Sequence, residues 1–73
     1  MSTTPTNPRD IRKAAGLPLI AAAVGARTSE TTARIYEANR ESVNTETRAR
    51  LDAFYAGLRT RAALAEVAER GAR

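Results

Sequence analysis

Cysteine, histidine and tryptophan are all absent from this sequence of 73 residues. Without cysteine there is no disulfide bond, and without cysteine or histidine the usual ligands of zinc and iron–sulfur sites are missing. The same absences remove the thiol nucleophile and the commonest general base of enzymes. We therefore expect a protein that is not an enzyme and that needs no cofactor.

Long apolar segments are missing as well. No run approaches the roughly 20 residues that cross a membrane, and the first residues are polar, without the apolar core of a signal peptide. A chain of 73 residues has room for one small domain, which buries a modest fraction of its surface. We expect a cytoplasmic protein with no membrane partner.

Basic residues outnumber acidic ones by 12 to 8, which gives a formal net charge of +4. Lys13 is the single lysine, so the other basic residues are arginines. The planar arginine fork pairs with phosphate oxygens and with guanine edges, so this balance favours a nucleic-acid partner. Codon bias in a GC-rich genome is the alternative explanation.

Residues 17–39 have the pattern of two short helices joined by a turn. Pro18 suits a first helical turn, where its missing N–H is not needed. Apolar residues then recur at helical spacing, namely Leu19, Ile20, Ala23 and Val24. Gly25 is predicted to end this helix, because glycine is common in the left-handed conformation just past a helix end.

A second helix is predicted over about residues 29–38, after a short polar turn. Thr28 or Ser29 caps it by accepting hydrogen bonds from its free amides. The side chains predicted to face inward are Thr32, Ile35 and Tyr36. Two such helices form the helix-turn-helix, whose second helix enters the DNA major groove. An ordinary helical hairpin in a small bundle is the alternative.

The segments before this motif are a tail and a short helix. Residues 1–8 have no charged side chain and little to bury, which predicts a disordered tail. Residues 9–15 suggest a helix that is capped by Asn7 or Asp10 and ends at Gly16.

A polar loop with Val43 tucked under the next helix follows the motif. Asn44 or Thr45 is predicted to begin that helix, with Glu46 in its first turn. One apolar stripe is expected along it, consisting of Leu51, Phe54, Tyr55, Leu58, Ala62 and Ala65. The predicted core combines both parts of the chain: Ile20, Val24, Ile35, Leu51, Phe54 and Leu58.

The last segment, residues 59–73, is Ala-rich and helical in pattern. It either extends the previous helix or begins a new one after Gly57, since a glycine inside a helix costs only about 1 kcal/mol relative to alanine. Leu64 and Val67 fall on a second apolar face that the domain itself cannot cover. This face predicts a homodimer or higher homo-oligomer through the C-terminal helix, with an exposed tail as the alternative.

The run from Val43 to Phe54, VNTETRARLDAF, resembles the third helix of lac-repressor-family headpieces. The Ile20-Ala21 and Val24-Gly25 pairs are similar to the first helix of that motif. The segment also resembles Cro and phage-repressor domains, and the similarity covers residues 17–58. It departs from the headpiece pattern by one extra residue after Gly25 and by Thr32 in a place normally held by Val or Ile. Headpieces of that family precede a large effector domain, and we expect none here because the 73 residues leave no length for it.

The resemblance implies that the second helix presents one face to the groove, formed by Ser29, Glu30, Ala33, Arg34 and Glu37. Arg34 is the best candidate to read a base, because an arginine fork on guanine is the commonest specific contact. The full set of predicted DNA contacts is Arg27, Thr28, Ser29, Glu30, Ala33, Arg34, Arg40, Thr45, Thr47 and Arg48. Of these, Arg27, Arg40, Thr45, Thr47 and Arg48 would hold phosphates.

The sequence therefore predicts an all-α fold, a helix-turn-helix bundle of four to five helices with a C-terminal helical extension. The DNA-binding domain is expected over residues 9–58, on double-stranded DNA, in a cytoplasmic, nucleoid-associated transcriptional regulator such as a repressor. Two alternatives remain. One is an architectural or recombination accessory protein that binds DNA, and the other is a helical interaction module that does not.

Overall fold

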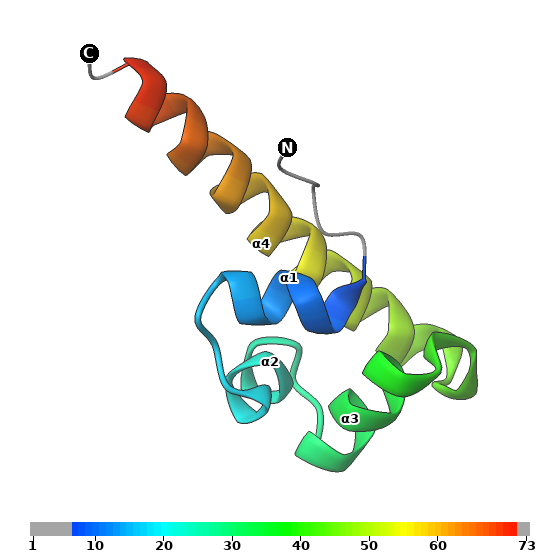
Figure 1. Ribbon diagram of the computed structural model, residues 1–73. Coiled ribbons are helices and arrows are strands. Elements are labelled where there is room, and N and C mark those ends of the chain that lie inside the picture. Colours follow the sequence, from blue (N-terminus) through cyan, green and yellow to red (C-terminus); the bar gives the residue numbers. More distant parts are fainter. Residues whose placement is uncertain (1–6, 72–73) are drawn as a thin grey trace.

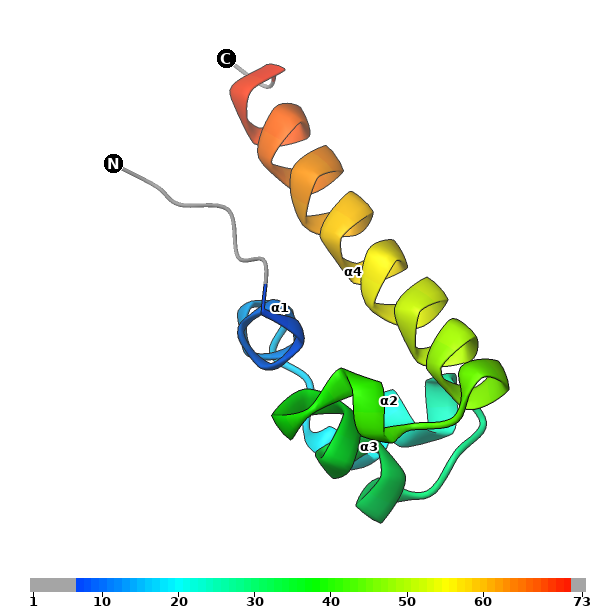
Figure 2. The ribbon, with the colours of Figure 1, turned by 90° about the vertical axis from the view of Figure 1, so that its right-hand side faces the viewer.

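The computed structural model describes residues 7–71, except for the side chains of residues 66, 69, 70 and 71. All regular structure in this part of the chain is helical: α1 (Pro8–Ala14), α2 (Leu19–Gly25), α3 (Glu30–Ala38), the 3₁₀ turn η1 (Arg40–Ser42) and α4 (Thr45–Gly71). Figures 1 and 2 show α1, α2 and α3 gathered around the N-terminal half of α4, while its C-terminal half projects beyond them. The predicted all-α bundle is confirmed.

The start and end of α1 follow from two residues. The side chain of Asn7 accepts a hydrogen bond from the amide of Arg9 (2.9 Å) and caps the helix, and Gly16 follows its end with a φ of 72°. Asn7 was one of the two predicted caps, and Gly16 was the predicted end. The prediction of a disordered tail over residues 1–8 is wrong for Asn7 and Pro8, which begin this helix. Residues 1–6 lie outside the described part of the chain.

Residues 45–71 form a single helix, which decides between the two predicted arrangements. The side chain of Asn44 accepts from the amide of Thr47 (2.8 Å) and caps α4 as predicted. Gly57 lies inside the helix without breaking it. At 1.5 Å per residue the helix is about 40 Å long, and the molecule measures 44 Å along its longest axis. Residues 72 and 73, at the end of the predicted extension, lie outside the described residues.

The core is built largely on alanines where α2 meets α3. Ala22 and Ala23 of α2 and Ala33 of α3 have no exposed surface, so the two helices approach closely on small side chains. Larger residues close this core from the other elements: Ile11, Tyr36, Val43, Leu51, Tyr55 and Leu58.

The predicted core is right for two residues and wrong for three. Leu51 and Leu58 are buried as expected, whereas Ile20, Val24 and Ile35 are 48%, 71% and 43% exposed. Three buried positions of α2 and α3 are held by alanines instead, namely Ala22, Ala23 and Ala33. Phe54 is partly buried and packs against the edge of the core. Ala62 and Ala65, also predicted on the core stripe, are exposed, because they line an open depression at the end of α1 and are not enclosed by the core.

α2 ends at Gly25 as predicted, but not for the predicted reason. Gly25 is the last residue of α2 and is not in the left-handed region. A Cβ atom at this position would lie 2.2 Å from Cε1 of Phe54, so glycine lets the Phe54 ring of α4 pack directly on the helix backbone.

No helix in the described part of the chain is long and apolar enough to cross a membrane.

Candidate nucleic-acid interface

The turn between α2 and α3 has an arginine in a left-handed conformation. The amide of Arg27 donates to the Val24 carbonyl (3.1 Å) and the amide of Thr28 to the Ala23 carbonyl (2.9 Å). This pair of bonds is typical of a helix end that passes through one left-handed residue. Here that residue is Arg27, with a φ of 58°. At the end of α1 the equivalent position is held by Gly16, so an arginine stands where glycine is the unstrained choice.

Two further contacts fix the direction in which α3 begins. Nε of Arg50 in α4 donates to the carbonyl of Ala26 at the end of α2 (3.1 Å). The hydroxyl oxygen of Ser29 accepts from the amide of Thr32 (3.1 Å), which confirms the predicted cap. The same hydroxyl donates to Oγ1 of Thr32 (2.8 Å). The N-terminal turn of α3 is therefore held in place by both of its neighbouring helices and by its own cap.

α3 has one buried face and one exposed face. Ala33 and Tyr36 are buried, and only 8% of the Glu37 side chain is exposed. The opposite face carries exposed residues only: Glu30, Thr31, Arg34, Ile35 and Ala38. In Figures 1 and 2 the start of α3 lies at the opposite end of the molecule from the C-terminus of α4, and none of the described helices covers it. α3 thus presents a free helical face at one end of the protein.

This exposed face is rotated from the predicted one. Ala33 and Glu37 were expected to face a DNA groove but point into the molecule, whereas Ile35 was expected inside and is exposed. Thr31, which the prediction did not include, lies on the exposed face. The prediction buried the largest aliphatic side chain of the helix. The structure instead buries Ala33, which fits against α2, and Tyr36, whose hydroxyl has a partner inside the protein.

The two charged residues of the exposed face pair with each other. Nη2 of Arg34 lies 3.0 Å from Oε1 of Glu30, one helical turn away, and the side chains are 63% and 45% exposed. An exposed pair of this kind contributes at most about 1 kcal/mol. Arg34 can therefore exchange Glu30 for another partner at little cost.

The buried face of α3 is fixed by a polar network with α1 and α4. Nε and Nη2 of Arg12 donate to the two oxygens of Glu37 (2.7 and 3.1 Å), and the Tyr55 hydroxyl donates to the same carboxylate. The Arg12 and Glu37 side chains are only 12% and 8% exposed. Arg12 also donates to the carbonyl of Leu17 (2.9 Å), in the loop before α2. One carboxylate thus joins three helices.

This network changes the pKa values of its members. Burial alone would raise the pKa of Glu37, but hydrogen bonds from Arg12 and Tyr55 outweigh it and lower that pKa. Burial and the hydrogen bond to Glu37 raise the pKa of Tyr55 above its ordinary value. Glu37 is therefore a carboxylate at neutral pH and Tyr55 a neutral hydrogen-bond donor.

A second, more exposed network joins α3, η1 and α4. The Tyr36 hydroxyl donates to Oδ1 of Asp52 (2.5 Å), and Arg40 donates to both oxygens of the same carboxylate. Glu41 then lies between Arg40 and Arg48, at 2.8 and 2.7 Å from their guanidinium nitrogens. Burial, with the hydrogen bond to Asp52, raises the pKa of Tyr36 to about 12. Arg40 and Arg48 thus have carboxylate partners within the protein.

The structure separates the predicted DNA contacts into two groups. Five lie together in the turn and the first two turns of α3: Arg27, Thr28, Ser29, Glu30 and Arg34. The others lie elsewhere or point inward. Ala33 and Thr47 are buried, so their assignment to DNA contact was wrong. Arg40 and Arg48 belong to the second network. Thr45 is exposed at the start of α4. The candidate interface is therefore smaller than predicted and centred on α3.

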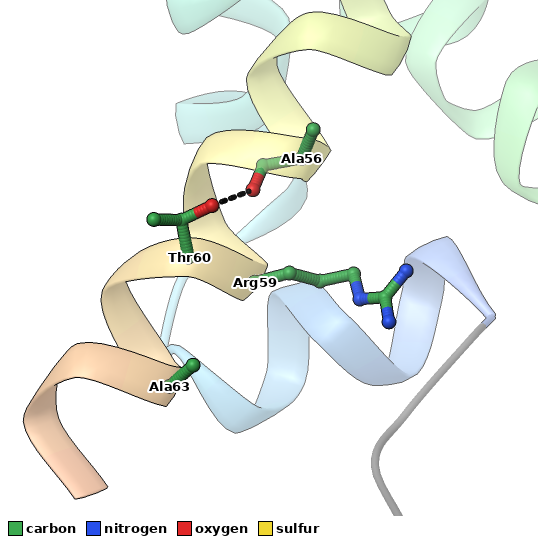
Figure 3. A pocket seen from close by; sticks show the side chains of 4 residues that line it. All are labelled: Ala56, Arg59, Thr60 and Ala63. Atoms are coloured by element: carbon green, nitrogen blue, oxygen red, sulfur yellow. Dashed lines mark hydrogen bonds between the residues drawn. The ribbon is translucent and has the colours of Figure 1, made fainter. Parts of the chain in front are cut away.

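Other surface features lie outside this group. Arg9 of α1 and Arg34 of α3 line one depression between their helices, which places a second basic residue beside the exposed face. Another depression lies along α4, where Ala56, Arg59, Thr60 and Ala63 surround an open hollow (Figure 3). Its single polar link is internal, from the Thr60 hydroxyl to the Ala56 carbonyl (3.1 Å).

Comparisons with protein-family models, with curated proteins and with solved structures gave no match to this chain.

Proposed function

We propose that the protein is a sequence-specific DNA-binding regulator that inserts the exposed face of α3 into the major groove. The observation that carries this proposal is the free N-terminal part of α3, held on one side by α1, α2 and α4 and uncovered on the other. Two helices joined by a four-residue turn, with the second helix projecting, form the usual geometry of a helix-turn-helix. Such a protein would be found with the nucleoid.

The charges near α3 support the same proposal. Arg34 lies on the exposed face, Arg27 in the turn before it, and Arg9 on α1 beside it. Arginines at the edges of a reading helix position a protein on phosphates, whereas base edges are read from the helix face. The basic balance of the whole chain, +4, acts in the same direction.

Binding measured as a function of salt separates this proposal from its alternatives. Affinity of the full chain is measured for random-sequence duplex DNA and for a sequence that the chain selects from a random pool. A regulator binds the selected sequence about 10³-fold or more tightly than random DNA. An architectural protein binds all sequences alike with steep salt dependence, and an interaction module binds none at low salt.

Arg34→Ala is expected to lower affinity for the selected sequence by about 1–3 kcal/mol and to change affinity for random DNA much less, as for a base contact. The fold should be unaffected, since Arg34 makes only an exposed pair with Glu30. Binding isotherms and thermal melts check this. Arg59→Ala, at an exposed arginine of α4 before the segment proposed to pair with a second copy, is the control. Equal losses on both DNAs would mean that Arg34 does not read a base.

Arg27→Gly is expected to separate stability from binding. Glycine removes the strain of the left-handed position, so the variant should be as stable as the wild type or more stable, by up to about 1 kcal/mol. Affinity should fall for every DNA sequence, and the dependence of log K on log salt should weaken by about one unit, as for one lost phosphate contact. Arg27→Lys, which keeps the charge, is the control. Unchanged affinity in the glycine variant would exclude Arg27 from the interface.

We further propose that the projecting part of α4 pairs with that of a second copy. Leu64 and Val67 are 63% and 61% exposed there, whereas the end of α1 approaches this helix at Ala62 and Ala65. A single helix-turn-helix contacts only a few base pairs, and a two-fold dimer reads two half-sites about one helical turn apart.

Truncation after Arg59 is therefore expected to convert a dimer to a monomer and to weaken DNA binding about a hundredfold or more, through loss of bivalent contact. Light scattering and binding isotherms check the two effects. Leu64→Asp in the full chain should do the same without shortening the helix, since Leu64 does not pack against the domain. Equal mass and equal affinity of the truncated and full chains would exclude this helix as an assembly element.

A further inference from the structure

Ile35 is a large apolar residue on the exposed face of α3, where 43% of its surface is accessible. It lies beside Arg34 in the sequence, on the helix that the proposed function places in the major groove. The residue is therefore placed where it can contact bases.

The neighbouring polar side chains have partners within the protein. Ser29 and Thr32 are bonded to each other at the cap, and Glu30 pairs with Arg34. Within the described part of the chain, no side-chain hydrogen bond or ion pair involves Thr31. Ala38 is small. Thr31 and Ile35 are therefore the two larger side chains of this face that have no such bond.

Thr31 and Ile35 are four residues apart, so their side chains are neighbours on the helix surface. Thr31 lies on the side of α3 away from the buried pair Ala33 and Tyr36. The methyl group of Thr31 and the branched side chain of Ile35 together give the middle of the exposed face an apolar character.

Among the base edges of the major groove, thymine is distinguished by its 5-methyl group, which apolar side chains contact. We propose that Ile35, together with the methyl group of Thr31, contacts the 5-methyl group of a thymine in the DNA site. The proposal rests on the proposed function and assigns one base of the recognised DNA sequence to this contact. Successive helical residues point about 100° apart, so Arg34 and Ile35 face the groove in different directions.

Uracil tests this proposal, because it differs from thymine only by the missing methyl group. The full chain first selects a sequence from a random pool, and duplexes of that sequence are then made with each thymine replaced in turn by uracil. The wild type is expected to lose about fourfold in affinity at one position of each half-site, the amount expected for one buried methyl group. Ile35→Ala should bind the thymine duplex more weakly and show no further loss with uracil at that position.

Val24→Ala is the matched control, since Val24 is an exposed apolar residue (71%) that belongs to α2 and not to the exposed face of α3. It should keep the full uracil effect, and thermal melts should show all three proteins folded. Tolerance of uracil at every position by the wild type, or an undiminished uracil effect in Ile35→Ala, would overturn the inference while leaving DNA binding intact. A pool from which no sequence is selected would instead contradict the proposed function.

Discussion

Arg12→Ala is expected to destabilise the domain by about 3–5 kcal/mol, because it leaves Glu37 as a buried carboxylate without its cation. A domain of this size has a total stability of only several kcal/mol, so most of the variant should be unfolded at 37 °C. Denaturation followed by circular dichroism measures the change. Arg40→Ala, which removes the equivalent cation from the exposed network, is the control and should cost far less. Equal costs would mean that burial of the Arg12–Glu37 pair has no energetic role.

The two polar networks, that of Glu37 and that of Tyr36, predict how stability depends on pH. The pKa of Glu37 is lower in the folded protein than its ordinary value of 4.5, so its contribution is complete above that value and is lost as the pH falls through the folded pKa. Tyr36 has the opposite sign. Its folded pKa is raised from 10.0 to about 12, so its contribution is present below pH 10 and is lost as the pH rises toward 12. Urea titrations across the acid range should show a shallower loss for Arg12→Ala than for the wild type.

Leu51→Ala is expected to cost about 2–5 kcal/mol, through lost burial and the cavity that remains. Leu51 is fully buried at the centre of the core. Val24→Ala, a truncation of an aliphatic side chain that is 71% exposed, should change stability by no more than about 0.5 kcal/mol. The free energies of unfolding of the two variants check this. A larger loss at Val24 than at Leu51 would contradict the described core.

The local structure of the chain was largely predictable from the sequence. Asn7, Ser29 and Asn44, each one of two predicted candidates, cap their helices, and Gly16 ends α1 as predicted. These features depend on residues close together in the sequence, whose preferences are strong on their own. Helix caps therefore gave reliable boundaries without any knowledge of the tertiary structure.

The faces of α2 and α3 were not predictable in the same way. Helical periodicity allows more than one inward face when alanines are common, and the prediction chose the face with the larger side chains, Ile20, Val24 and Ile35. The structure buries the alanine face because the two helices pack closely. Close packing depends on contacts between distant segments, such as that of Gly25 with Phe54. One signal in the sequence did indicate this arrangement, the run of small residues from Ala21 to Ala23.

The candidate interface was predictable in position but not in detail. The turn and α3 were assigned to DNA contact, and Arg27, Ser29, Glu30 and Arg34 are exposed there. Thr31 and Ile35 were missed because the inward face had been chosen wrongly. Arg40 and Arg48 were assigned to phosphates because of their charge, and only the structure shows that they share Glu41.

The central claim is that the exposed face of α3 contacts DNA. The most direct measurement is an NMR titration of the ¹⁵N-labelled full chain with a duplex of the selected sequence, following each backbone amide. We expect the largest shift changes between Arg27 and Ile35, with smaller changes near Arg9. Two results would contradict this claim. One is unchanged amide shifts between Arg27 and Ile35 together with changed shifts in α4 beyond Leu58. The other is a spectrum that the duplex leaves unchanged.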